Sequence, residues 1–253
     1  MKDRFVKDLM TVKVYENKVL MGEGAAADVA AAVKDELSRK ETINMIYAAA
    51  PSQSTFLSAF TAMTDIPWER TRAFHMDEYT GLSEDAPQRF GNFLRMNLFS
   101  KVPFREVYYI DGNAPDADAE CRRYAALLEK YPVDIVCLGI GENGHIAFND
   151  PGVADFGDPV AVKVVPLDDV CRQQQVNDGC FATLQEVPTH AITLTIPALT
   201  RASSMFCIVP SRSKAPAVSG TVNGLVCEAC PASILRRKEN SFLYLDSDSS
   251  SLI

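Results

Sequence analysis

The chain has 253 residues, 47% hydrophobic and 23% charged, the proportions of a globular protein that can bury a sizeable core. Its formal net charge of −8 at pH 7 argues against non-specific nucleic-acid binding, which needs a basic surface. No apolar run approaches the ~20 residues that span a bilayer, and residues 1–5 carry charges of both signs, so we expect neither a membrane anchor nor a signal peptide.

Helical and strand patterns alternate along most of the chain. Apolar spacing predicts helices at residues 22–40, 55–63, 93–99, 116–131, 196–201 and 214–222. Short apolar runs predict strands at residues 43–50, 71–76, 107–110, 135–140, 191–194, 205–209 and 242–245. Strands that alternate with helices indicate βαβ units. We therefore expect a single α/β domain over residues 1–253, with three α/β/α layers and a Rossmann-like, mostly parallel sheet that carries helices on both faces. Its polar end, residues 246–251, is expected to fray.

Seven cysteines are dispersed between Cys121 and Cys230. An odd, scattered set is typical of reduced thiols, so we expect a cytoplasmic protein. Cys227 and Cys230 have the CxxC spacing of redox and zinc sites, but no second pair of ligands accompanies them. We expect these two cysteines to be structural.

The segment Leu138–Gly152 contains glycines, an asparagine, carboxylates and His145, one of only three histidines in the chain. It follows the apolar run Ile135-Val136-Cys137, which reads as a buried strand. Open α/β sheets bind their ligands in polar loops of this kind, and a histidine exchanges protons near neutral pH. The sequence therefore indicates a candidate active site in this loop.

Two stretches carry a specific resemblance. Gly144-His145 is followed by Ile-Ala-Phe-Asn-Asp-Pro, and the sequence Met76-Asp77-Glu78-Tyr79 ends an expected strand. Both resemble signatures of the glucosamine-6-phosphate deaminase family, which shares its fold with the 6-phosphogluconolactonases. The lactonases usually continue their Gly-His pair with Thr-Ala. The resemblance implies a sugar-phosphate substrate and chemistry without a metal or organic cofactor. The family commonly forms homo-oligomers, and nothing in the sequence identifies an interface.

The resemblance also implies roles for individual residues. The family's reaction opens the sugar ring, moves a proton from C2 to C1 and releases ammonia. Asp77 matches the base that takes the C2 proton, and Glu78 is expected to make supporting or packing contacts. His145 matches the ring-opening histidine, a role that suits imidazole chemistry.

The chain departs from the common family pattern on both sides of His145. Asn143 stands where many members have aspartate, and Asp150 stands where many have glutamate. Asparagine can orient an imidazole by hydrogen bonding but cannot stabilise an imidazolium by charge. We assign Asn143 and Asp150 to ring opening with His145, and expect the two changes to affect the rate or the choice of amino-sugar phosphate.

Residues at the start of the expected helix 55–63 are candidates for phosphate binding. Ser52, Gln53 and Ser54 occupy the place of the family's glycine-rich phosphate loop. Backbone N–H groups at a helix start favour an anion, and simple helix capping by serine is the alternative.

Three further residues complete the predicted substrate-binding set. Lys214, within Ser-Arg-Ser-Lys-Ala, resembles the family's phosphate lysine. No arginine stands at the family's other phosphate position, and Arg172 is the nearest substitute, although the adjacent residues 173–175 could equally be a solvated helix face. Gly144, beside His145, is assigned to substrate binding as well.

The segment after Pro151 bears on regulation. Some family members are activated by N-acetylglucosamine 6-phosphate through a segment rich in serine, arginine and lysine. Residues 153–160 contain no basic residue, and the first to follow is Lys163. We therefore expect no such allosteric site.

Three alternatives stay open at this point: a galactosamine-6-phosphate isomerase, a 6-phosphogluconolactonase and a non-catalytic sugar-phosphate sensor. The residues after His145 and the Met-Asp-Glu-Tyr motif argue against a lactonase. Retention of both Asp77 and His145 favours an enzyme over a sensor, because a binding protein needs no acid–base set.

Overall fold

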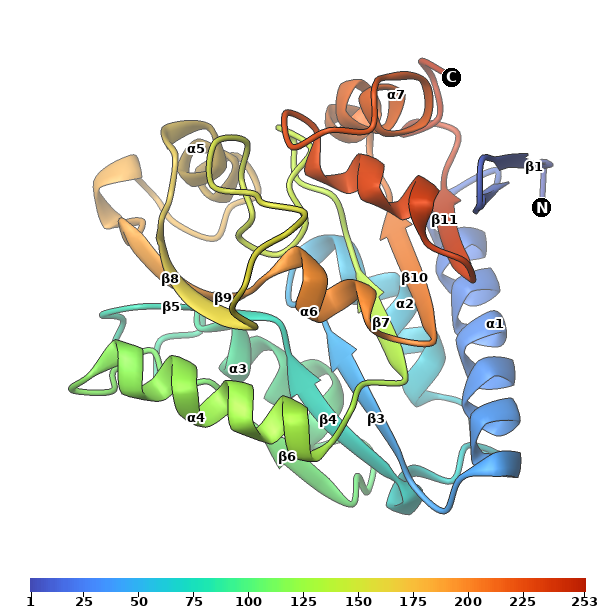
Figure 1. Cartoon of the computed structure of the whole chain (residues 1–253). Helices are drawn as coiled ribbons and strands as arrows, with labels where there is room; N and C mark the ends of the chain where they lie inside the picture. The colour runs from blue at the N-terminus through green and yellow to red at the C-terminus, as the bar shows by residue number, and fades with distance from the viewer.

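An eight-stranded sheet forms the centre of the molecule in this computed structural model, which describes residues 1–253 (Figure 1). In spatial order its strands are β1 (Asp3–Lys7), β2 (Met10–Val14), β11 (Ser241–Leu245), β10 (Ser204–Val209), β7 (Ile135–Leu138), β3 (Ile43–Tyr47), β4 (Thr71–His75) and β6 (Glu106–Tyr108). Only β1 and β2 pair antiparallel, and all other neighbours are parallel.

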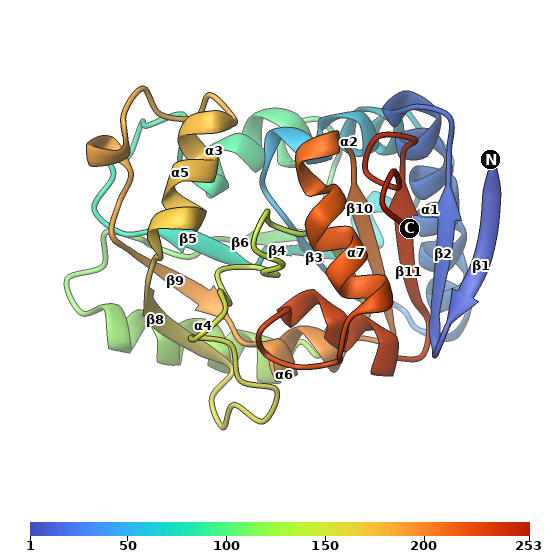
Figure 2. The ribbon, with the colours of Figure 1, turned by 90° about the horizontal axis from the view of Figure 1, so that it is seen from above.

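Helices cover both faces of this sheet. One layer contains α1 (Lys18–Arg39), α2 (Ser54–Thr61) and α3 (Phe90–Leu94), and the other contains α4 (Ala117–Lys130), α6 (Ile196–Thr200) and α7 (Ala215–Asn223). Alternate side chains of each buried strand face opposite layers. In β7, Ile135 and Cys137 join the core under α1 and α2, whereas Val136 and Leu138 join the core under α4 and α7. Figure 2 shows the two helical layers on opposite sides of the strands. The predicted three-layer, mostly parallel α/β fold is confirmed.

A smaller antiparallel sheet lies at one side of the main sheet. It contains β5 (Asp77–Tyr79), β9 (His190–Leu194) and β8 (Val162–Pro166), in that order. The backbone N–H of Leu194 donates to the carbonyl of Met76 over 2.8 Å, which joins this sheet to the end of β4. Helix α5 (Asp169–Asn177) packs here through Cys171, which belongs to a third apolar cluster with Tyr79 and Phe148. The smaller sheet therefore fixes its strand β5, and the helix α5 that packs on it, next to the end of β4 in the main sheet.

The order of the strands creates a switch point between β3 and β7. The chain leaves β3 through α2 to reach β4 on one side, whereas β7, on the other side of β3, has β10 and β11 as its further neighbours. The loops that follow β3 and β7 therefore diverge and leave a crevice at the carboxyl ends of the strands. Open α/β sheets bind ligands at such a point.

Several helices and strands begin or end at other residues than the sequence predicts. The strands expected at 43–50 and 135–140 end at Tyr47 and Leu138, where the chain leaves the sheet to form the loops at the crevice. The helix expected at 22–40 begins at Lys18, because the Asn17 side chain accepts hydrogen bonds from two backbone N–H groups of the first turn. The helix expected at 93–99 is α3 followed by a π-turn at Arg95–Phe99.

The sequence patterns did not reveal β1, β2, β5, β8 or α5. Strand β1 is an edge strand with mostly exposed residues, and β5 has only three residues, so neither leaves a clear periodic signal. The expectation of a fraying end was wrong. Ser249 is fully buried and donates its backbone N–H to Asp246 Oδ1 over 2.8 Å, which anchors the segment. No helix of the structure is long and apolar enough to cross a membrane.

Candidate active site

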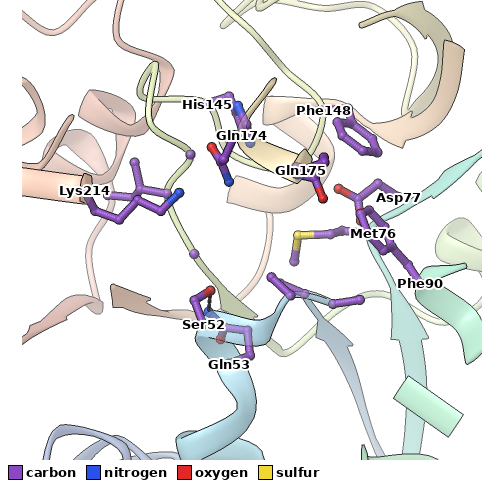
Figure 3. Close-up of a pocket in the computed structure, with 17 residues that line it drawn as sticks. Ser52, Gln53, Met76, Asp77, Phe90, His145, Phe148, Gln174, Gln175 and Lys214 are labelled. Carbon is purple, nitrogen blue, oxygen red and sulfur yellow. Dashed lines mark hydrogen bonds between the residues drawn. The ribbon is translucent and has the colours of Figure 1, made fainter. Parts of the chain in front are cut away.

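A cavity opens at the crevice between β3 and β7 (Figure 3). Its wall comes from the loops after β3, β4, β7 and β10, from helix α5 and from the start of α3. The lining residues are Ala48, Ala49, Ala50, Ser52, Gln53, Met76, Asp77, Phe90, Gly139, Ile140, Gly141, His145, Ala147, Phe148, Gln174, Gln175 and Lys214. The structure thus brings five predicted residues from four separate segments to one cavity: Ser52, Gln53, Asp77, His145 and Lys214.

Asp77, the first residue of β5, is a buried acid in the cavity wall. Its side chain is part of the lining in Figure 3, and the residue is only 6% exposed. Burial, reinforced by the neighbouring charge of Glu78, raises the pKa of the Asp77 carboxyl well above its usual range. A carboxylate with a raised pKa is a stronger base once it is ionised, which suits the removal of a proton from carbon.

His75 supports Asp77 and was not assigned a role from the sequence. Its Nδ1 lies 2.8 Å from the backbone oxygen of Asp77, and its Nε2 accepts from the Ile110 N–H over 2.9 Å. Burial lowers the pKa of His75 to about 4, so the ring is neutral near pH 7. Since Nε2 is an acceptor, Nδ1 carries the proton and donates to Asp77. The available signal was its position two residues before Asp77 at the end of a buried strand.

Glu78 stabilises the neighbouring helix rather than facing the cavity. Its carboxylate accepts hydrogen bonds from the backbone N–H groups of Phe90 and Gly91 over 3.0 and 2.9 Å, at the start of α3. A carboxylate in this position satisfies N–H groups that have no partner within the helix. The expected supporting role of Glu78 therefore agrees with its contacts, and these contacts place Phe90 at the cavity wall.

His145 lies on the loop after β7 with its ring against a glycine. A Cβ atom on Gly141 would lie only 2.1 Å from Cε1 of His145, so a larger residue would displace the ring. Gly144 has a φ of +86°, which glycine adopts without strain, and a Cβ there would meet Cys230 Sγ at 3.0 Å. Gly144 is not part of the cavity wall. The structure therefore gives it a conformational role instead of the expected contact with substrate.

Asn143, His145 and Asp150 form one hydrogen-bonded cluster. The Nδ1 atom of His145 lies 2.7 Å from Asn143 Oδ1 and 2.8 Å from Asp150 Oδ1, and Asn143 Nδ2 donates to Asp150 Oδ1 over 2.9 Å. Asp150 is fully buried. Burial raises the pKa of its carboxyl, but hydrogen bonds from His145, Asn143 and Cys171 and the charge of His145 outweigh this, so the pKa is lowered. The cluster thus keeps an ionised carboxylate beside the imidazole.

The same cluster contains the one combination of side chains in the structure that could hold a metal ion. The ligand atoms of His145, Asp150 and Cys171 all lie within 4.8 Å of one another. A cysteine binds a metal ion as the thiolate. Burial raises the pKa of the Cys171 thiol, and Oδ1 of Asp150 is already hydrogen-bonded to His145 and Asn143. These contacts fit an acid–base cluster better than a metal centre.

Lys214 is a buried cation without a hydrogen-bond partner. It is 5% exposed, its Nζ makes no hydrogen bond, and the nearest carboxylate oxygen, of Glu142, lies 3.9 Å away. Burial lowers the pKa of Lys214, although nearby acidic groups, including Asp178 and Glu142, oppose this. A buried cation that makes no hydrogen bond and has only the long ion pair with Glu142 is costly, so the site favours an anion. Figure 3 shows Lys214 and Asp77 on opposite sides of the cavity.

A second hollow, lined by polar side chains and two prolines and here termed the polar hollow, adjoins the cavity at Lys214. It shares Ser52 and Lys214 with the cavity, and the rest of its wall consists of Lys18, Pro51, Ser54, Thr55, Asp178, Pro210, Ser211 and Ser213. It lies at the start of α2, where backbone N–H groups and the helix dipole attract an anion. The predicted phosphate residues Ser52, Ser54 and Lys214 therefore lie together, at the end of the cavity away from Asp77.

Two predicted binding residues have other contacts. The Nε2 of Gln53 donates to the backbone oxygen of Ile208 in β10 over 3.0 Å, so this side chain also fastens the loop after β3 to the sheet. Arg172 is not part of the cavity wall. Its guanidinium donates to the carbonyls of Leu184 and Val187 over 2.7 and 3.1 Å. The structure therefore does not support Arg172 as a phosphate ligand, because these backbone contacts hold it away from the cavity.

Helix α5 supplies lining residues that the sequence did not single out as ligands. Gln173 is exposed, whereas Gln174 and Gln175 are buried and line the cavity. Gln174 Oε1 accepts the backbone N–H of Glu142 over 2.8 Å. The side chain of Gln175 makes no hydrogen bond within the protein. The proposed solvated helix face is therefore correct for Gln173 alone. Spacing along α5 could have revealed the two buried residues, had the helix been recognised.

The fold and the site together define a class: an α/β protein with acid–base groups and a buried lysine that makes no hydrogen bond, arranged around one cavity at a sheet switch point. Residues 16–244 match the family described as glucosamine-6-phosphate isomerases/6-phosphogluconolactonase. The chain belongs to this family.

Curated relatives of this chain are named as glucosamine-6-phosphate deaminases. The chain is 35% identical to a glucosamine-6-phosphate deaminase of Listeria innocua over 211 residues, 83% of this chain and 88% of the relative. It is 37% identical to one of Bacillus thuringiensis over 183 residues, 72% of this chain and 68% of the relative.

The solved structures that resemble this chain include both a deaminase and 6-phosphogluconolactonases. A monomeric glucosamine-6-phosphate deaminase superposes with a TM-score of 0.87 at 27% identity, covering 96% of this chain and 99% of that one. A 6-phosphogluconolactonase of Trypanosoma brucei superposes with a TM-score of 0.79 at 17% identity, covering 98% and 99%, which shows a shared fold alone. The predicted family is confirmed.

Proposed function

We propose that this chain converts glucosamine 6-phosphate and water into fructose 6-phosphate and ammonia. The observation that carries the proposal is one cavity with a buried acid, Asp77, on one side and a buried cation without a hydrogen-bond partner, Lys214, on the other. A sugar phosphate has the matching arrangement, since its phosphate lies at one end of the carbon chain and its reacting carbons lie at the other. The named deaminase relatives at 35% and 37% identity support this choice of substrate.

The reaction begins with ring opening at His145. The imidazole takes the proton of the anomeric hydroxyl and returns a proton to the ring oxygen, which exposes the C1 aldehyde. Asp150, ionised and 2.8 Å from Nδ1, stabilises the imidazolium that forms in between. Asn143 holds the ring through its 2.7 Å contact. The charge that asparagine lacks is therefore supplied by Asp150.

Proton transfer between carbons is assigned to Asp77. Its carboxylate removes the C2 proton and returns it to C1, while a second proton passes from the amine nitrogen to O1; the product is an imine at C2 with a hydroxyl group at C1. Water then adds to this imine and ammonia leaves, giving the C2 ketone of fructose 6-phosphate. Burial and the raised pKa of Asp77 favour the first step because they strengthen the base.

The phosphate is assigned to the polar hollow at Lys214, with hydroxyl groups from Ser52 and Ser54. The charge of Lys214 is then compensated by the substrate, and the fixed phosphate keeps C1 and C2 in register with Asp77. Such positioning lowers the barrier by several kcal/mol.

The test measures ammonia and fructose 6-phosphate released from glucosamine 6-phosphate by the purified protein. Galactosamine 6-phosphate and 6-phosphogluconolactone are assayed in parallel. Turnover of glucosamine 6-phosphate that disappears in Asp77→Asn is the expected result. Turnover of the galactosamine substrate or the lactone alone would replace the proposal, and binding without turnover of any of the three would make the chain a sensor.

We further propose that residues 1–253 act as one domain in the cytoplasm. All seven cysteines are free, which is consistent with a reducing compartment. Light scattering of the purified protein distinguishes the homo-oligomer common in the family from the monomer described for the 27%-identical relative.

A further inference from the structure

The side-chain amide of Asn143 is held by three residues from two segments, the loop after β7 and the start of α5. Its Nδ2 lies 2.9 Å from Asp150 Oδ1 and 3.2 Å from Asp168 Oδ2. Its Oδ1 accepts the backbone N–H of His145 over 3.1 Å. Carboxylates only accept hydrogen bonds and a backbone N–H only donates, so the NH₂ group must face the two aspartates and the oxygen must face His145.

This orientation of Asn143 determines where the proton of His145 resides. Nδ1 of His145 faces two acceptor oxygens, Asn143 Oδ1 at 2.7 Å and Asp150 Oδ1 at 2.8 Å. Nδ1 therefore carries the proton of the neutral ring, and Nε2, which makes no hydrogen bond within the protein, is left to accept a proton. If the amide of Asn143 turned over, its NH₂ would face Nδ1 and compete with the Nδ1 proton, and Asp150 Oδ1 would be the one acceptor left to hold that proton.

Asp168 differs from Asp150 because it contacts the amide of Asn143 but not the imidazole of His145. Asp150 Oδ1 is shared between Asn143 and the imidazole, whereas Asp168 accepts from Asn143 and makes no contact with the ring. Asp168 is also the N-cap of α5, since its Oδ1 accepts the backbone N–H of Cys171 over 2.6 Å. Its two oxygens thus join the start of α5 to the loop of His145.

We propose that Asp168 is a positioning residue for His145: it fixes the amide of Asn143 and thereby holds the imidazole in the tautomer with the proton on Nδ1. Asp168 lies 25 residues after Asn143 in the sequence, so the two residues that form this contact belong to different segments. The kinetic part of the proposal rests on the proposed deaminase function, whereas the tautomer does not.

The primary experiment reads the tautomer by ¹⁵N NMR of the imidazole nitrogens in the full chain. Only three histidines are present, so each signal is assigned by replacing one of them. The variant is Asp168→Asn, which keeps the shape of the side chain but places an NH₂ group against Cys171 N–H or against the NH₂ of Asn143. The matched control is Asp169→Asn, which removes the same charge from the next residue; Asp169 contacts Arg172 and is exposed.

We expect His145 to carry its proton on Nδ1 in the wild type and in Asp169→Asn, and to populate the Nε2–H form in Asp168→Asn. An unchanged His145 signal in Asp168→Asn would overturn the proposal. If Asp168→Asn does not fold, Asp168→Ser takes its place, because serine caps a helix as well as aspartate does and still removes the acceptor of Asn143.

Kinetics supply the second readout. General acid–base groups contribute roughly 10²- to 10⁴-fold to a rate. We expect the kcat of Asp168→Asn to be at least about tenfold lower than that of the wild type, because His145 then loses part of this contribution. Its KM should stay within about twofold of the wild-type value. Asp169→Asn should keep both constants. Equal kcat in the two variants would contradict the proposal, whereas an inactive wild type with the predicted tautomers would contradict only the deaminase assignment.

Discussion

The imidazole of His75 donates from Nδ1 to the backbone carbonyl of Asp77 over 2.8 Å. The ring is fully buried and is fastened on its other side to the backbone N–H of Ile110. A neutral histidine with two fixed partners thus holds the residue to which we assign the base. Reactive geometry at Asp77 depends on this contact as well as on β5, which pairs Asp77 with Thr193 of β9.

Replacing Asp77 with asparagine should abolish turnover while preserving substrate binding. The amide has nearly the shape of the carboxyl group but cannot take a proton from carbon. A general base contributes about 10²- to 10⁴-fold, so kcat should fall by at least this factor. Calorimetric titration with glucosamine 6-phosphate measures binding to the variant. Residual turnover above about a tenth of the wild-type value would exclude Asp77 as the base.

The acidic side of the pH profile should reflect the raised pKa of Asp77. The base works only when it is ionised, so activity should fall as the pH decreases through this pKa. Burial places this pKa well above the usual range, so the acidic limb of kcat/KM should lie above the ~3.9 of a free aspartate. The profile is measured with saturating and limiting substrate. A flat profile down to pH 4 in a folded protein would contradict the assignment.

His75 should make the fold less stable in mild acid. Its pKa is about 4 in the folded protein and 6.5 for the ordinary group. Between these values the unfolded chain binds a proton that the folded chain does not, so stability is complete above pH 6.5 and decreases as the pH falls toward 4. The difference between these two pKa values corresponds to a decrease in the free energy of unfolding on the order of 3 kcal/mol.

Urea unfolding between pH 4 and 7 measures this loss. His75→Asn, whose amide can stand in for Nδ1 as the donor, should lower stability at pH 7 but make it less dependent on pH. His190→Asn is the control, since His190 is exposed on β9. Equal pH dependence in the wild type and His75→Asn would show that another group is responsible.

Lys214→Met should weaken substrate binding and stabilise the free protein. The variant loses a charge-assisted contact to phosphate, worth about 1.5–3 kcal/mol, so KM should rise roughly 10- to 100-fold. It also removes a buried cation without a hydrogen-bond partner, so the melting temperature without ligand should rise. Inorganic phosphate should stabilise the wild type but not the variant.

The control for this prediction is Arg212→Met, two residues earlier and exposed. It removes the same charge outside the polar hollow, so its KM and its response to phosphate should stay close to those of the wild type. Equal responses in both variants would mean that the hollow attracts phosphate only through its general charge.

Substrate saturation should be hyperbolic and insensitive to N-acetylglucosamine 6-phosphate. Residues 153–160 contain no basic residue. Lys163, the first to follow, is already bound to Asp158 Oδ2 and to the carbonyl of Val153 over 2.7 and 3.0 Å. Initial rates with and without this ligand test the prediction. Sigmoidal kinetics that became hyperbolic on its addition would contradict it.

The sequence by itself determined the fold class and indicated candidates for the reactive residues. The alternation of apolar runs with amphipathic segments follows from the local geometry of strands and helices, so it can be read without tertiary contacts. The two motifs at Met76–Tyr79 and Gly144–Pro151 specified Asp77, His145 and Asp150, because contiguous residues keep their spacing whatever the fold does. The short strand β5 and the helix α5 were not predicted, because neither contains enough residues with a clear hydrophobic periodicity.

Only the tertiary structure decided which side chains meet. It placed Lys214 and Ser52 at one hollow although the two lie on loops after different strands, and it directed Arg172 and Gly144 elsewhere. It also revealed the contact of Asn143 with Asp168, which joins the loop after β7 to the first turn of α5. Contacts of this kind depend on how separate elements pack, and neither propensity nor periodicity within one segment contains that information.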